Sequence, residues 1–234
     1  MSRGLRTIVA CEVLRLDLEA VMAENRSAVP VDFKFMEIAL HRTPQKMPAR
    51  LAEAIREAEA EGAGEIILAY GLCSHGVAGL SSSCGLSIAR CHDCLGLMLG
   101  SPRRHKAILS KWPGALYLFD GMMEADFDPL SSLERDYIPR LGEKRARRAM
   151  ELYFKHYSHF AYIENQARRD PKYKKRFEEN CRAFKKDPLE IPSDLEYIRR
   201  LVHGPRQPLD IFINLPPGES LCSEDFYLDQ RPVS

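Results

Sequence analysis

The sequence lacks the features that mark membrane, secreted or nucleic-acid-binding proteins. No apolar run approaches the ~20 residues that a membrane-spanning helix needs. Glu12 and Asp17 interrupt the apolar N-terminal stretch and no small-residue cleavage site follows, so we expect no signal peptide. The formal net charge of +1 provides no global attraction to nucleic acid or anionic lipid. We therefore expect a cytoplasmic protein that binds neither a membrane nor nucleic acid.

Common nucleotide-binding and hydrolase motifs are also missing. The chain has no GxSxG sequence, no Walker loop and no Rossmann glycine fingerprint. The glycines of the segment GLCSHGVAG lack phosphate-binding spacing. We interpret Gly71 and Gly76 as residues of a cofactor-binding loop, where they allow a sharp turn and a close backbone approach beside a site.

The cysteine content points to chemistry rather than to disulfide bonds. The chain has seven cysteines, and an odd number agrees poorly with a disulfide framework. In a reducing compartment, cysteines bind metals, take part in catalysis or pack in the core. A length of 234 residues, of which 45% are hydrophobic, suits one large α/β domain or such a domain with a helical extension.

Short apolar runs separated by helical patterns predict the fold class. The predicted strands are residues 6–10, 31–40, 65–70, 86–90, 115–119 and 209–214. Helical segments separate most of them, and the best is the Ala/Glu/Arg-rich run that begins near Pro48 and ends at Gly62 or Gly64. This alternation predicts an α/β fold with a mostly parallel, Rossmann-like, doubly wound sheet.

The C-terminal half has a different composition. Residues 129–204 are rich in Arg, Lys, Glu and Tyr, and we expect a helical insertion or cap there. It would contain one or two long helices over 134–170 and another over 187–204, with Ser193 as a plausible N-cap of the latter. Residues 1–128 would then be the core, and residues 205–234 would add a final strand that rejoins the core and a tail. Glutamates interleave with the basic residues, which favours a solvated surface over RNA binding.

Reactive side chains follow almost every predicted strand. In strand order they are Cys11, His41, Cys73 with His75, the run Cys91-His92-Asp93-Cys94, Asp120, and finally Cys222 after the last strand and its turn. The carboxyl ends of parallel strands meet at one edge of a sheet, and ligands bind in the crevice there. The sequence therefore predicts that these side chains converge on one site.

Thiolate and imidazole groups together suit a transition metal, with zinc first and copper, nickel or iron as alternatives. Cys73, His92 and Cys94 would be ligands around an open fourth position, which is the arrangement of catalytic zinc sites. Cys11 or His41 would be a fourth ligand or a proton-transfer group. Either of two carboxylates, Asp93 or Asp120, would orient the imidazole.

Other interpretations of the cysteines stay open. A cysteine at a strand end is often a small buried hydrophobic residue, and we interpret Cys84 and Cys181 in this way. Cys91 and Cys94 also form a C-x-x-C pair, which can support thiol redox chemistry at a helix N-terminus.

Two segments, YGLCSHGVAGL and IARCHDCLGLMLGS, resemble a bacterial and archaeal family of domains of unknown function, DUF1638. The resemblance runs over most of the chain. Its YGLC-type loop and R-x-HDC-type segment single out Cys73, His92, Asp93 and Cys94, with His41 next, whereas Cys91 and His75 are less typical. Members of the family are often associated with corrinoid-dependent methyltransferase systems, so the resemblance implies methyl transfer and a corrinoid as a candidate partner cofactor.

A likeness at the site supports methyl transfer. Zinc-dependent thiol methyltransferases bind their metal through an H-x-C pair and a distant cysteine, and His92, Cys94 and Cys73 are the same residue types in a different order. Those enzymes are barrels, so the likeness is an analogy between sites.

Three functional hypotheses follow. The first is a zinc-dependent enzyme that activates a thiol or water, with a small molecule or a corrinoid protein as its partner. The second is a non-catalytic accessory protein that binds a metal or corrinoid. The third is a thiol redox protein that uses Cys91 and Cys94. The oligomeric state stays open, and a homo-oligomer is among the alternatives.

Overall fold

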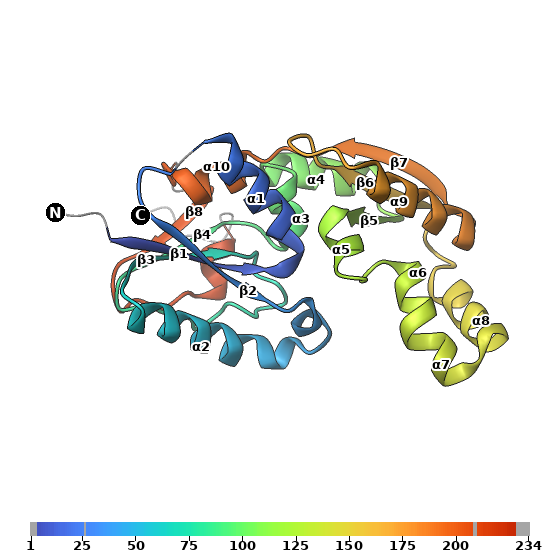
Figure 1. Cartoon of the computed structure of the whole chain (residues 1–234), viewed down its shortest axis with the longest axis horizontal. Coiled ribbons are helices and arrows are strands. Elements are labelled where there is room, and N and C mark those ends of the chain that lie inside the picture. Colours follow the sequence, from blue (N-terminus) through green and yellow to red (C-terminus); the bar gives the residue numbers. More distant parts are fainter. Residues whose placement is uncertain (1–3, 26, 208–209, 228–234) are drawn as a thin grey trace. The chain divides into compact units, whose positions relative to one another are not determined.

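The computed structural model describes residues 4–25, 27–207 and 210–227, and the chain divides into two compact units (Figure 1). The first unit combines Met1–His105 with Leu195–Ser234, and the second is Lys106–Asp194. The second unit thus begins before the strand at 115–119, earlier than the predicted insertion at 129–204. Within the described ranges, no helix is long and apolar enough to cross a membrane.

A five-stranded sheet forms the centre of the first unit. Its order is β2-β1-β3-β4-β8, where the strands are β1 (Leu5–Cys11), β2 (Val31–Met36), β3 (Ala63–Ala69), β4 (Leu86–Ala89) and β8 (Phe212–Leu215). The first four are parallel, and β8 is antiparallel to β4. This confirms the mostly parallel, Rossmann-like sheet. The last strand lies slightly later than the predicted 209–214, and Leu209 is outside the described residues, as are residues 228–234 of the predicted tail.

Helices cover both faces of this sheet (Figure 1). One face carries α2 (Met47–Ala60), and the other carries α1 (Arg15–Glu24), α3 (Cys94–Met98) and α10 (Glu196–His203). Pro48 lies in the first turn of α2, and Gly62 has φ +91° just after its end. The central strands are buried on both faces, which explains their continuous apolar sequence.

The second unit contains a parallel three-stranded sheet of its own, in the order β5-β6-β7. Its strands are β5 (Ala115–Phe119), β6 (His159–Glu164) and β7 (Asp187–Pro192). Its helices are α5 (Asp120–Glu124), α6 (Pro129–Ser132), α7 (Ile138–Leu141), α8 (Glu143–Tyr153) and α9 (Pro171–Phe184), while α4 (Pro102–Lys111) begins in the first unit and ends in the second.

These strands correct two secondary-structure predictions. The region 134–170 is not all helix, because its run Phe160–Ile163 is buried in the middle strand of this sheet. The helix predicted over 187–204 is instead an edge strand followed by α10. Edge strands tolerate proline, so β7 accommodates Pro188 and Pro192. Ser193 does not cap α10, because its Oγ accepts a hydrogen bond of 3.1 Å from the amide of Gln166.

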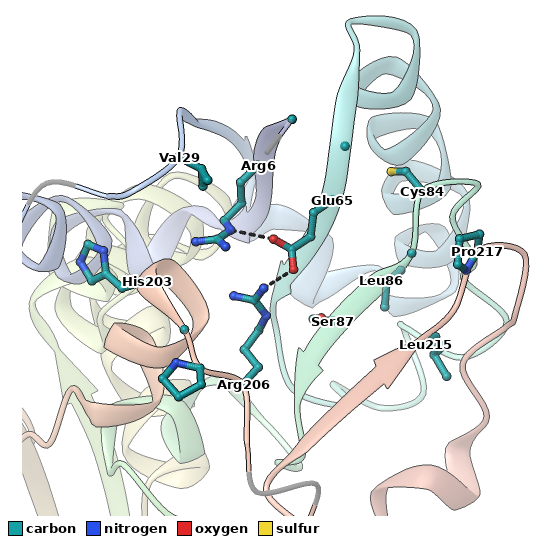
Figure 2. Close-up of a pocket in the computed structure, with 15 residues that line it drawn as sticks. Arg6, Val29, Glu65, Cys84, Leu86, Ser87, His203, Arg206, Leu215 and Pro217 are labelled. Atoms are coloured by element: carbon teal, nitrogen blue, oxygen red, sulfur yellow. Dashed lines mark hydrogen bonds and ion pairs between the residues drawn. The ribbon is translucent and has the colours of Figure 1, made fainter. Parts of the chain in front are cut away.

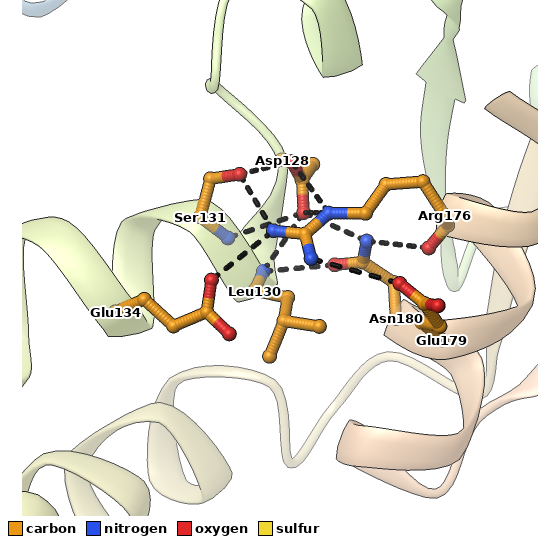
Figure 3. A network of polar contacts seen from close by, with 7 residues as sticks. All are labelled: Asp128, Leu130, Ser131, Glu134, Arg176, Glu179 and Asn180. Carbon is orange, nitrogen blue, oxygen red and sulfur yellow. Dashed lines mark hydrogen bonds and ion pairs between the residues drawn. The ribbon is translucent and has the colours of Figure 1, made fainter. Parts of the chain in front are cut away.

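A buried carboxylate ties two helices of the second unit together (Figure 3). Asp128 is fully buried and caps α6, where its Oδ1 accepts the amides of Leu130 and Ser131 at 3.1 and 3.2 Å. The same oxygen accepts the Asn180 side-chain amide at 2.7 Å, and the guanidinium of Arg176 lies 3.3 Å away. Because Asn180 and Arg176 belong to α9, this network joins α9 to α6.

Candidate functional site

The candidate site lies at the carboxyl ends of the parallel strands in the first unit. The chain passes from β1 to β2 on one side of β1, and then returns to β3 on its other side. Such a switch point opens a crevice in which ligands bind. Cys11 is the last residue of β1, and Tyr70 directly follows β3, so both residues lie at this crevice.

Backbone hydrogen bonds join the loops that follow β3 and β4. The Leu72 amide donates to the Cys91 carbonyl, and the Cys73 amide donates to the His92 carbonyl, each at 2.9 Å. Gly71 makes this close approach feasible, because a Cβ atom there would lie 2.5 Å from the Asp93 nitrogen. The pairing of β3 with β4 therefore continues into the loops that carry the cysteines.

A left-handed turn follows this contact. Cys73, Ser74 and His75 have φ values of 46°, 56° and 66°, although none of them is glycine. Non-glycine residues in this region cost on the order of 1–3 kcal/mol each and are concentrated at functional sites. The turn packs tightly, because a Cβ atom on Gly76 would lie 2.3 Å from the Met47 sulfur. The sequence therefore maintains a costly loop shape directly at Cys73.

Three thiols from three separate segments meet at this edge: Cys11 ends β1, Cys73 lies in the loop after β3, and Cys94 begins α3. Cys11 and Cys73 are buried and Cys94 is partly buried. Hydrogen bonding with the Cys94 thiol lowers the pKa of Cys11. Interactions with the thiols of Cys11 and then Cys73 raise the pKa of Cys94 well above its usual value. Cys94 thus interacts with both of the other thiols.

Tyr70 lies beside the three thiols. Its side chain is 2% exposed, and its hydroxyl lacks a hydrogen-bond partner of ordinary geometry among the described residues. Burial, and then the proximity of Cys11, Cys94 and Cys73, raises the pKa of this hydroxyl well above its usual value. A buried polar atom without a partner is costly and calls for an explanation such as a bound ligand.

Cys91 is the more deeply buried cysteine of the C-x-x-C pair. It is 5% exposed, and burial followed by the proximity of Cys73 raises its pKa well above the usual value. A buried thiol that resists ionisation is a poor nucleophile. The side chains that most affect the pKa of Cys94 are Cys11 and Cys73, and not its C-x-x-C partner Cys91.

Asp93 caps α3 and faces a histidine that the sequence analysis missed. Its Oδ1 accepts the Gly96 amide at 3.1 Å and lies 3.6 Å from Nε2 of His105. His105 is 5% exposed, and burial lowers the pKa of its imidazole. Its sequence signal is weak, because it follows Arg103 and Arg104 in a basic helix whose exposed side is charged.

The remaining predicted residues are spread more widely. His92 is exposed, and its ring lies 5.4 Å from that of Tyr227 between centroids. His41 is exposed in a 3-10 helix, Ile38–Arg42. Asp120 belongs to the second unit, where its Oδ1 accepts a 2.5 Å hydrogen bond from Tyr162 and burial raises its pKa to about 6. Within the described part of the chain, no group of three or more His, Cys, Asp or Glu side chains is arranged to hold a metal ion.

Comparison with known proteins yields one match. The model of a family described as "Protein of unknown function (DUF1638)" matches residues 35–202, which is more than half of the chain. This range contains Cys73 and Cys94, whereas Cys11 precedes it. No match was found among curated proteins or among solved structures.

Proposed function

The chain belongs to the DUF1638 family of proteins of unknown function, and we propose that it is a metal-dependent enzyme that binds zinc through Cys11, Cys73 and Cys94. The observation that carries this proposal is the meeting of these three thiols, which come from the end of β1, the loop after β3 and the start of α3. Cys11 precedes Cys73 and Cys94 by more than sixty residues in the sequence, yet all three reach the same crevice, which is the location that sheet topology favours for a ligand.

The surroundings of the thiols support a ligand at this place. The left-handed turn fixes Cys73, the cap made by Asp93 fixes the start of the helix that begins with Cys94, and Tyr70 leaves a buried hydroxyl without an ordinary partner. Soft thiolate ligands suit zinc and related transition metals. A bound ion would require the three thiols, which now interact with one another, to turn toward it.

Three protein ligands would leave a fourth position for a substrate. A bound zinc ion would supply the positive charge that keeps a coordinated thiol or water deprotonated near neutral pH. His92 is exposed in the same loop as Cys94, so it is the histidine that we assign to proton transfer or to the fourth position. The contact between half-exposed Asp93 and buried His105 would help to hold that segment in place.

Methyl transfer is the specific reaction that we propose. A substrate thiolate would attack the methyl carbon of a donor, and the bond between that carbon and its leaving group would break. The family resemblance favours this reaction, with a corrinoid as the candidate methyl carrier, and a thiolate-rich zinc site is chemically suited to activating a thiol.

Metal content tests the site directly. We expect about one zinc per chain in protein purified without a chelator or a metal-affinity tag. Cys11→Ser, Cys73→Ser and Cys94→Ser should each lose most of this metal. Cys181→Ser is the matched control, because Cys181 is a buried thiol of the second unit and should not affect the metal. Replacing zinc by cobalt adds an optical readout, a thiolate charge-transfer band that should weaken in each of the three site variants.

Two outcomes would overturn the metal proposal. One is wild-type protein that contains no stoichiometric metal and binds none when zinc is added. The other is full metal content in the Cys94→Ser variant, because Cys94 interacts with both other thiols.

The same contacts favour thiol redox chemistry as the second candidate. Cys94 interacts most strongly with Cys11, so the disulfide to expect is Cys11–Cys94 rather than Cys91–Cys94. Formation of this bond releases two electrons, which an external disulfide such as oxidised glutathione would accept as it is reduced to two thiols. Peptide mapping after mild oxidation distinguishes the candidates: a reversible Cys11–Cys94 bond in metal-free protein favours the redox function.

A further inference from the structure

A separate cavity of about 730 Å³ lies in the first unit, away from Cys11, Cys73 and Cys94, and Cys84 is among the residues that line it (Figure 2). Its lining comes from the starts of three strands and from the segments after α10 and β8. Gly4, Glu65 and Leu86 mark the amino ends of β1, β3 and β4, whereas the thiols lie at the carboxyl ends of these strands. The volume falls within the range of small-molecule sites.

Two arginines and one glutamate dominate the cavity. Nε of Arg6 donates to Glu65 Oε2 at 2.8 Å, and Nη2 of Arg206 donates to the other carboxylate oxygen of Glu65. The side chains of Arg6 and Arg206 are 11% and 12% exposed. One carboxylate thus neutralises only one of two largely buried guanidinium groups, and the group retains a net positive charge.

Backbone contacts fix both guanidinium groups in place. Nη1 of Arg6 donates to the Val202 carbonyl, and Nη1 of Arg206 donates to the Leu201 carbonyl at 3.2 Å. These carbonyls belong to the last turn of α10. The two arginines are therefore held before any ligand arrives, which reduces the entropic cost of binding.

Unused donors remain on both side chains. A guanidinium has five N–H groups, and the contacts described use two on Arg6 and two on Arg206. Among the described residues, no nitrogen of Arg6 or Arg206 is both buried and unpartnered, and both side chains line the cavity. His203 adds an imidazole to the same wall.

We propose that this cavity binds a small molecule through an anionic carboxylate or phosphate group, which the guanidinium groups of Arg6 and Arg206 recognise. Planar guanidinium donors match the oxygens of both groups, and in a largely buried setting charge-assisted hydrogen bonds are strong. Glu65 both positions the arginines and limits the affinity, since it competes with the ligand for the same donors.

Calorimetric titration with inorganic phosphate, and separately with succinate, tests this assignment at constant ionic strength. We expect millimolar or tighter binding of at least one probe, and the stronger one identifies the anionic group. Arg206→Gln should weaken that binding at least tenfold, whereas Glu65→Gln should strengthen it severalfold. Arg199→Gln is the matched control, because Arg199 pairs with Glu24 on the surface and does not line the cavity.

Three results would overturn the proposal: no heat from either probe, equal binding by wild type and Arg206→Gln, or an equal loss in Arg199→Gln. If Arg206→Gln fails to fold, the Glu65→Gln variant tests the proposal instead. Anion binding by Glu65→Gln that is no tighter than that of wild type would count against the site. Metal content should be unchanged in Glu65→Gln, since its cavity is at the opposite ends of the strands from the thiols.

Discussion

The backbone amide of Cys73 donates a 2.9 Å hydrogen bond to the carbonyl of His92. This bond brings together two loops whose cysteines are about twenty residues apart in the sequence. It also couples the position of the Cys73 thiol to that of Cys94, which begins α3 two residues after His92. Changes that separate the loops should therefore affect the thiol group even when no cysteine is altered.

Gly71→Ala should separate these loops. Its Cβ atom would meet the Asp93 backbone at 2.5 to 2.8 Å, so the loops must move, at a cost of about 1–3 kcal/mol. We expect a lower urea midpoint together with a loss of zinc binding. Gly142→Ala is the control, because it has a positive φ in the second unit with open space around the added atom. Gly142→Ala should lose some stability but keep its zinc. Unchanged zinc content in Gly71→Ala would contradict the coupling between the two loops.

Ser74→Val should destabilise the left-handed turn. Ser74 has φ +56°, which a β-branched side chain tolerates poorly, and we expect a loss of about 1–2 kcal/mol in the free energy of unfolding. Ser74→Gly should remain within about 1 kcal/mol of wild type, because glycine adopts this conformation freely. Ser110→Val on exposed α4 should change stability little. Equal effects at Ser74 and Ser110 would show that the turn stores no strain.

Asp120→Asn should remove a pH dependence of stability. Burial raises the pKa of Asp120 to about 6, so between about pH 4 and pH 6 the folded state holds a proton that the unfolded state has released. Wild-type stability should thus fall as pH rises through this window, by at most about 3 kcal/mol. Asp120→Asn should lack this fall and be the more stable protein at pH 7. Denaturation of both proteins at pH 4.5 and pH 7 measures this difference in the free energy of unfolding. An equal change in stability between the two pH values in wild type and Asp120→Asn would refute the prediction.

Asp128→Ala should destabilise the second unit strongly. It removes the cap of α6 and leaves the Asn180 amide and the Arg176 guanidinium without their shared acceptor (Figure 3). We expect a loss of about 3 kcal/mol. Glu143→Ala removes an exposed pair with Arg147 and should cost less than about 0.5 kcal/mol. Urea denaturation compares the two, and a small effect at Asp128 would show that α9 and α6 are held by other contacts.

The strands of the first unit were predictable because central parallel strands are buried on both faces, so their sequences are continuous runs of apolar residues. The strands at 159–164 and 187–192 were not, for two physical reasons. Aromatic residues such as Phe160 and Tyr162 suit a buried helix face as well as a strand, and prolines at 188 and 192 suggest a break until the strand is known to lie at an edge. Whether such a segment forms a strand depends on the strands that pair with it. Those strands lie elsewhere in the sequence, so the local pattern does not reveal them.

The sequence alone determined the fold class and the family, because the first depends on local pattern and the second on recognisable segments. It also predicted that reactive side chains, with Cys11, Cys73 and Cys94 among them, converge at the carboxyl ends of the strands, because parallel strands share one direction. Tertiary structure decided what depends on contacts between distant segments. It placed Asp120 in the second unit, at the start of the helix that follows β5, turned His92 toward Tyr227 and brought the buried His105 to Asp93. It also assembled the Arg6–Glu65–Arg206 group, since Arg206 is two hundred residues from Arg6 in the sequence and only folding brings both to the same carboxylate.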